Sequence, residues 1–458
     1  MPGGLSRVAF VTLALAGTAY ANPLSMTGSS ARSIGRAGTG LVSDDGAGAL
    51  VQDPAALARR DTWRVQIGAS FADDTIHWQS SAADAPLSTD QAGDTVLPQV
   101  AVVGSIGDFV VGAAFMTLGA TDRELRDPFE VGIDQYKHAF DYRFAGVAGS
   151  MRRDAFLVGA AHRLGDSVAV GLSLGASRFK MSETRRMWVG FQNAIGDAQL
   201  GDPLRDLEVS FDADGFTPSA TAGLFVAPED TPIELGLSAT YTKFARLDGN
   251  IASQGVTGGP SLLVPDTSVS IAVRQPFIAR AGGRYVGDRV TFELGGELYL
   301  VDDRAQSTVW ALADGTFARD ARPANGSDPA STPLASIPSR LSERTHAAIR
   351  GALDVELVAG FLWVTGGYAY DVGGTAGTRL SPTFGDLGGH TFALGVEGTA
   401  GGFTYTAGWS RTITRARQGE SAWTLDNPFD GNRAVNPGSY DGSIDQIGVL
   451  VDVELGGH

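Results

Sequence analysis

Val290-Thr291-Phe292-Glu293-Leu294-Gly295-Gly296-Glu297-Leu298-Tyr299-Leu300 is the stretch that decides the fold of this 458-residue chain. Large apolar residues alternate with polar or small ones, and two carboxylates share the second face. Alternation over about ten residues is the pattern of a strand with one face toward lipid and the other toward a lumen. The stretch therefore predicts one strand of a transmembrane β-barrel.

The same alternation recurs along the chain. It is clear in residues 233–242, 353–357, 403–410 and 447–455. Short turns are predicted at 107–108, 165–166, 227–232, 287–288, 359–360 and 401–402. Longer polar stretches lie at 73–95, 119–142, 182–206, 248–265, 302–343, 372–388 and 414–442. Six short and seven long connections in strict alternation predict an all-β, antiparallel barrel of about fourteen strands, with the long loops outside the cell.

Composition agrees with a barrel and excludes other classes of protein. Glycine contributes 61 residues and charged residues only 19% of the chain, which suits a large β-structure. With no cysteine there is no disulfide framework, and a net charge of −16 argues against nucleic acid as a partner. A soluble β-sandwich or propeller also alternates, but the regular order of short and long connections favours the barrel.

The first 21 residues are typical of a secretory signal peptide. Arg7 precedes a short apolar run at 8–17, and Ala19-Tyr20-Ala21 forms an A-x-A cleavage site. A membrane anchor is the alternative, but it needs about 20 apolar residues, more than this run provides. We expect export and a mature chain that starts at Asn22.

Residues 22–61 do not have the pattern of a strand. They are rich in glycine and include Asp53-Pro54-Ala55, where Pro54 suits the first position of a helical turn and Asp53 suits its N-cap. A barrel of fourteen strands has a lumen too wide for side chains alone to fill. We therefore expect 22–61 to plug the lumen and 62–458 to form the barrel.

Several motifs resemble one known family, the FadL-type outer-membrane transporters of long-chain fatty acids and aromatic hydrocarbons. Ser33-Ile34-Gly35-Arg36-Ala37-Gly38, Asp44-Asp45 and Asp53-Pro54-Ala55-Ala56-Leu57 resemble that family's N-terminal hatch. Later stretches at 264–269, 367–371, 380–386 and 390–395 are similar to its downstream motifs. The hatch residues implied are Gly35, Arg36, Gly38, Asp53, Pro54 and Ala55. The chain departs from the family in having Asp53 where Asn is usual, and in ending without an aromatic residue.

The resemblance implies passive uptake of a hydrophobic molecule through the outer membrane of a Gram-negative cell. It also implies a kink in the third strand, through which the ligand leaves the lumen sideways. Residues 109–118 are apolar on both faces, and Gly112 is the place where we expect a bend. The predicted ligand pathway is Val110, Gly112, Ala114, Met116 and Leu118. The alternative is that these side chains simply pack against the plug.

An exterior capture site is predicted in 181–207. Trp188 and Phe191 stand in a stretch whose apolar residues recur every three or four positions, as in a short amphipathic helix. The alternative is packing between loops over the barrel mouth.

Motifs for enzymes and metals are weak. Gly171-Leu172-Ser173-Leu174-Gly175 matches G-x-S-x-G, but it lies in a plain alternating strand instead of a strand-turn-helix elbow. The six histidines have no metal-ligand spacing, so we expect no metal site. Since no catalytic motif stands in a suitable context either, we expect no enzyme and no cofactor. A structural or adhesive surface barrel and a barrel-embedded lipid hydrolase are the alternative functions. The expected partners are a hydrophobic ligand, outer-membrane lipid and lipopolysaccharide, and the barrel assembly machinery, around a monomer.

Overall fold

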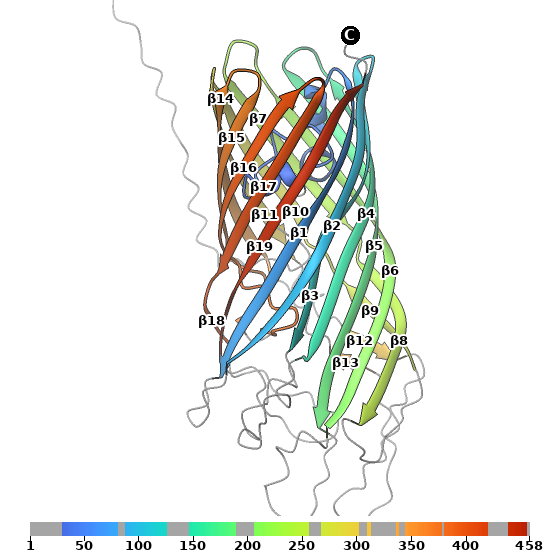
Figure 1. The fold of residues 1–458 in the computed structure, drawn as a ribbon. Coiled ribbons are helices and arrows are strands. Elements are labelled where there is room, and N and C mark those ends of the chain that lie inside the picture. Colours follow the sequence, from blue (N-terminus) through green and yellow to red (C-terminus); the bar gives the residue numbers. More distant parts are fainter. Residues whose placement is uncertain are drawn as a thin grey trace, which may run out of the picture.

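The computed structural model describes residues 30–80, 88–125, 146–188, 206–255, 267–301, 309–312, 336–338, 344–377, 380–419 and 438–455. Its strands form one antiparallel sheet that closes on itself (Figure 1). The first nine are β1 (Trp63–Ser80), β2 (Ser88–Ile106), β3 (Phe109–Leu125), β4 (Ala148–Arg163), β5 (Val168–Trp188), β6 (Asp206–Val226), β7 (Ile233–Thr242), β8 (Ala245–Gly255) and β9 (Thr267–Val273). The others are β10 (Phe277–Val286), β11 (Val290–Leu300), β12 (Val309–Leu312), β13 (Ser336–Pro338), β14 (His346–Val358), β15 (Leu362–Asp371), β16 (Gly389–Ala400), β17 (Phe403–Thr414), β18 (Arg417–Gln418) and β19 (Gly438–Leu455).

The barrel has fourteen wall strands, as the sequence predicted. Closure comes from β1, which pairs along its whole length with β19, from Trp63 opposite Leu455 to Ser80 opposite Gly438. Five wall strands are interrupted. For example, β7 and β8 both pair with β6 and so form one wall strand. On their other side, β10 pairs with β7 and β9 pairs with β8, so β9 and β10 form the next one. Counting β7/β8, β9/β10, β11/β12, β13/β14 and β17/β18 once each reduces the nineteen segments in the described residues to fourteen.

All six predicted short turns are confirmed, and glycine explains several of them. Gly107, Gly165 and Gly360 have positive φ angles of 61°, 80° and 67°, which glycine adopts without steric cost. These turns gather at one end of the barrel, near the C-terminus in Figure 1. The strand ends that the longer connections join lie at the opposite end, and those connections fall largely outside the described residues.

The outer wall is apolar and the inner wall is mostly polar or small. In β11, Val290, Phe292 and Leu294 are exposed on the outside, whereas Thr291 and Glu293 are buried inside. The outward positions of the other strands repeat this pattern, so one hydrophobic band surrounds the barrel. None of the helices among the described residues is long and apolar enough to cross a membrane.

The strands extend further than the sequence predicted. β5 and β6 each run for 21 residues and stay paired as far as Trp188 opposite Asp206. The predicted helix within 181–207 is therefore wrong for 181–188, and the rest of that stretch lies outside the described residues. Alternation disappeared there because strands that pass beyond lipid no longer need an apolar face, although their backbones still pair.

Residues 30–61, called here the inner segment, lie inside the barrel near the short turns (Figure 1). They form α1 (Ala31–Ile34), α2 (Ala49–Gln52) and the 3₁₀ helix η1 (Pro54–Arg59). The predicted turn after Pro54 is confirmed. Asp53 caps it by accepting a hydrogen bond from the Ala55 amide at 2.9 Å.

Candidate functional site

Ion pairs tie one side of the inner segment to the barrel wall. The guanidinium of Arg36 is buried and contacts two wall carboxylates, Glu293 on β11 at 2.8 Å and Asp354 on β14. Glu293 also accepts a hydrogen bond from the Val42 amide at 2.9 Å. All four carboxylate oxygens of Glu293 and Asp354 accept hydrogen bonds, which is a condition for buried charges to be tolerated. Arg36 therefore fixes the position of the inner segment against β11 and β14.

Glycines in the wall let the inner segment approach the strands at backbone distance. A Cβ on Gly367 of β15 would collide with the backbone of Arg36, and one on Gly408 of β17 would collide with that of Ala31. On the opposite side, a Cβ on Gly171 of β5 would overlap the backbone at Ala55. The predicted hatch residue Gly35 takes part too, since its own Cβ would lie 2.7 Å from Gly395 Cα.

The other side of the inner segment is apolar and packs on β2 to β6. Leu50 and Leu57 belong to one buried cluster with Val103 of β2 and Leu157 of β4. Three residues of the predicted ligand pathway, Val110, Ala114 and Met116, are members of this cluster, and Leu118 packs against it. In this conformation these side chains pack against the inner segment, which is the alternative to a ligand pathway given above.

The backbone ladder between β2 and β3 is broken beside this apolar cluster. Pairing is regular from Ile106 opposite Phe109 to Gln99 opposite Met116, and resumes only at Ala92 opposite Glu124. Residues 93–98 of β2 and 117–123 of β3 lie between these points. In the same place β3 carries a bulge against β4 between Thr117 and Gly119, which leaves Leu118 as the additional residue. We call this stretch the wall break.

The bend predicted at Gly112 is wrong in position. Gly112 pairs in regular register with Val103 and with Gly159, and the bulge lies at Leu118. A Cβ on Gly112 would lie 3.2 Å from Val103 Cγ2 and 3.5 Å from the Leu50 side chain, so Gly112 lies against the packed cluster. A glycine permits a bend but does not impose one, whereas an extra residue in one strand does.

Deeper in the lumen, toward the long connections, the inner face of β4 and β5 carries both apolar and polar side chains. Met151 and Met181 are opposite each other on the inner face, and the next inward pair is Arg153 and Phe179. Arg153 is 9% exposed, with hydrogen bonds to Ser177 Oγ at 3.2 Å and Thr242 Oγ1 at 3.5 Å, and its guanidinium lies 5.3 Å from the Phe179 ring centre. Among the described residues no carboxylate pairs with it. A buried cation without a carboxylate partner is suited to an anionic group.

Known proteins resemble this arrangement. The family model described as outer membrane protein transport protein (OMPP1/FadL/TodX) matches residues 12–283, more than half of the chain. The chain belongs to this family. Its members are transport channels and not enzymes, so the chain is an outer-membrane β-barrel transporter of the FadL family.

Solved structures share the fold at low identity. A Pseudomonas aeruginosa FadL homologue is 17% identical with a TM-score of 0.72, covering 95% of this chain and all (100%) of that one. The Pseudomonas putida toluene transporter TodX is 14% identical with a TM-score of 0.68 and the same coverage. The Ralstonia pickettii toluene transporter TbuX is 14% identical with a TM-score of 0.62, covering 94% and 98%. No curated protein matches the chain.

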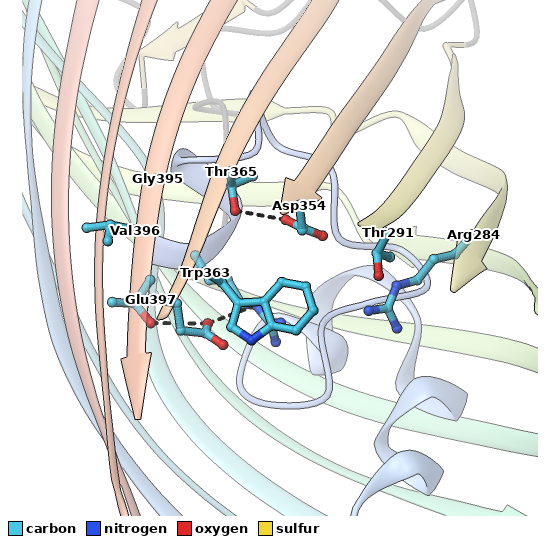
Figure 2. Close-up of a pocket in the computed structure, with 10 residues that line it drawn as sticks. Arg284, Thr291, Asp354, Trp363, Thr365, Gly395, Val396 and Glu397 are labelled. Atoms are coloured by element: carbon cyan, nitrogen blue, oxygen red, sulfur yellow. Dashed lines mark hydrogen bonds and ion pairs between the residues drawn. The ribbon is translucent and has the colours of Figure 1, made fainter. Parts of the chain in front are cut away.

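The FadL-family barrel also holds a polar cavity of about 240 Å³ between the inner segment and the wall, beside β11 and β14 to β17 (Figure 2). Arg32, Arg284, Asp354 and Glu397 line it, with Trp363 beside them. Arg32 and Glu397 form an ion pair at 3.2 Å, and Thr365 donates to Asp354 at 2.8 Å. This lining suits water and ions and is a poor route for an apolar chain.

The enzyme-like motif and the predicted capture site involve residues of β5 and of the stretch that follows it. Ser173 of the G-x-S-x-G match sits in regular β5 and donates to the Leu50 carbonyl at 2.6 Å, so it is structural. The described part of the chain holds no group of side chains that suits a metal ion. Trp188 ends β5, and Phe191 lies outside the described residues, so the exterior capture site stays a prediction.

Proposed function

We propose that this FadL-family protein is a passive channel for long-chain fatty acids that releases its ligand into the membrane through the wall break. The inner segment acts as a plug that prevents straight passage to the periplasm, where the short turns lie. Export with cleavage after Ala21 places the mature protein in the outer membrane, where lipopolysaccharide surrounds it.

The observation that carries the lateral route is the position of the wall break. Leu97 packs there with Ala72 and Ala120, and Met116 lies at its end. Further along β3, Thr121 and Arg123 bind Asp74 of β1. Moving a palmitate chain through water would cost roughly 12 kcal/mol at about 0.8 kcal/mol per methylene. The polar cavity on the far side of the inner segment would expose the chain to such polar surroundings, whereas the wall break adjoins the apolar cluster around Met116.

Arg153 supports a fatty acid over a hydrocarbon as the ligand. Its guanidinium lacks a carboxylate among the described residues and borders Phe179 and Met151, which supply apolar contact for a chain. Arg153→Gln should weaken palmitate binding about tenfold or more, the effect of losing a charge-assisted hydrogen bond, and leave hexadecane binding unchanged. Equal losses for both ligands would indicate that Arg153 only supports the wall.

A disulfide across the wall break tests lateral release, since the chain has no cysteine of its own. Leu97→Cys with Ala120→Cys would join β2 to β3 where they are not paired. In a host that lacks its own channel, the oxidised variant should stop palmitate uptake, and a reductant should restore it. The control is Ala101→Cys with Ala114→Cys, register partners where the same strands are already paired. Normal uptake by the oxidised Leu97/Ala120 variant would refute the lateral route.

A further inference from the structure

We propose that Arg152 is the gate of the wall break, and that the carboxylate of an outgoing ligand opens it. This inference rests on the proposed lateral release. Arg152 lies on the outer face of β4, beside Asp154 and on the side of the strand where Phe156 and Val158 are exposed. Its neighbour Arg153 faces the lumen, so one strand presents an arginine on each side of the wall.

The guanidinium of Arg152 spans β3 and reaches β2. Nη1 donates to the Val96 carbonyl on β2 at 3.1 Å, inside the unpaired stretch 93–98. Nη2 donates to Thr117 Oγ1, the last residue before the bulge, at 3.0 Å. Nε donates to both carboxylate oxygens of Asp154 at 3.0 Å. One side chain thus joins three strands at the place where the backbone ladder is missing.

The wall break is closed by contacts of two kinds. Leu97 packs there with Ala72 and Ala120. Polar contacts also cross it, from Arg123 of β3 to Asp74 of β1 at 2.6 Å, and from Arg152 to Val96 on the outer side. Thr117 strengthens the outer contacts because its hydroxyl donates to Asp154 at 2.6 Å while accepting from Arg152. An apolar chain alone can displace Leu97, but it has nothing to exchange for the contacts of Arg152.

The three contacts of Arg152 differ in strength, and this difference defines the opening step. The contact with Asp154 joins two charges, whereas Val96 offers only a neutral carbonyl. All of these bonds have a cationic donor, but a carboxylate acceptor adds an opposite charge that the Val96 carbonyl lacks, so a ligand carboxylate would replace Val96 first. Nη1 then binds the carboxylate while Nε stays on Asp154. β2 is released from β3, and the chain of the ligand enters the lipid.

Such a gate distinguishes anionic from neutral amphiphiles of equal length. Uptake of radiolabelled palmitate and 1-hexadecanol is measured in intact cells of the channel-less host, with the amount of folded protein determined for each variant. Arg152→Gln should lower the ratio of palmitate to hexadecanol uptake by about tenfold relative to wild type, because the neutral ligand gains and the acid loses its advantage. Arg178→Gln is the matched control. Arg178 is an outward arginine on β5 that pairs with Asp214 at 3.0 Å, away from the wall break.

A second measurement follows the gate directly. In a Leu97→Cys protein, modification of the thiol by a membrane-permeant maleimide reports opening of the wall break. Palmitate should accelerate modification and hexadecanol should not, whereas with Arg152→Gln added the thiol should react rapidly without ligand. An unchanged uptake ratio or unchanged labelling in the Arg152 variant would overturn the gate. If the oxidised Leu97/Ala120 disulfide still blocks uptake in that case, lateral release stands and only the role of Arg152 fails.

Discussion

At the scale of single residues, glycine decides where the inner segment meets the wall. Gly366 and Gly367 are neighbours on β15, yet a Cβ on Gly366 would have nothing within 4 Å, whereas one on Gly367 would collide with the backbone of Arg36. Alternation explains the difference, because adjacent residues of a strand point to opposite faces. The two positions form a matched pair for testing contact between the segment and the wall.

Gly367→Ala should displace the inner segment while the barrel still inserts. The backbone of β15 is held by its neighbouring strands and cannot move away from the new methyl group, so the inner segment has to move. Ion conductance in planar bilayers should therefore rise. Gly366→Ala should conduct like wild type, because its new methyl group points outward. Equal conductance of the two variants would contradict a close contact between Gly367 and the segment.

Asp53 gives this plug a dependence on pH. Burial raises the pKa of its carboxyl to about 7, from 3.8, and Oδ2 has no hydrogen-bond partner. The docked segment therefore favours the protonated form. Docking is strongest below about pH 4 and weakens as the pH rises to about 7, by up to about 4 kcal/mol.

Asp53→Asn should remove that dependence, because the amide keeps the capping oxygen for Ala55 without the charge. Wild-type conductance should rise between pH 4 and pH 8, and the variant should stay near the pH 4 level. If both proteins gave the same pH profile, Asp53 would not be the group that titrates.

At the scale of elements, the sequence predicted the features that contact with lipid requires, namely the alternating strands. It did not predict the contacts between residues that are far apart in the sequence. The outer faces of 290–300 and 403–410 alternate because they meet lipid, and the six turns follow from glycine and aspartate. Arg36 was identified from its motif, but its partners Glu293 and Asp354 lie hundreds of residues away, and only strand register brings them together. The gate residue Arg152 carried no signal at all, since a polar outward residue near the end of the apolar band is ordinary.

The sequence predicted the bend on the correct strand, β3, but at Gly112, six residues before the bulge at Leu118. Between the paired positions, β2 has six residues, 93–98, and β3 has seven, 117–123. This difference of one residue is visible only when both strands are aligned, so no inspection of β3 alone locates it. Pro98 adds to the break because it has no amide hydrogen to donate.

Deleting Leu118 should close the wall break. Both strands would then have six residues between the paired positions, so the ladder could continue from Gln99 to Ala92 with one bond missing at Pro98. Palmitate uptake should fall at least about tenfold, because several backbone hydrogen bonds of about 1 kcal/mol each would have to open for every ligand. Leu118→Ala keeps the residue count and should retain uptake. Full uptake by the deletion variant would show that the bulge is not needed for release.

At the scale of the whole molecule, the inner segment and the barrel complement each other in charge. The segment brings Arg32, Arg36, Arg59 and Arg60, and the wall brings the carboxylates that they contact. These pairs are Arg32 with Glu397, Arg36 with Glu293 and Asp354, Arg59 with Glu234, and Arg60 with Asp452. The wall itself closes through β1 and β19 without help from the segment. The barrel should therefore fold when the segment is absent.

Deleting residues 30–60 should consequently leave an inserted barrel that is both open and selective for cations. Conductance rises because the obstruction is gone. Selectivity follows because Glu293, Asp354 and Glu397 lose their arginine partners from the segment and face the lumen as anions, which raises the local concentration of cations. Reversal potentials under a potassium chloride gradient measure this selectivity. Adding Glu293→Gln and Asp354→Asn to the deletion should reduce it while the conductance stays high. A deletion variant with the conductance of the full-length protein would mean that these residues do not obstruct the lumen.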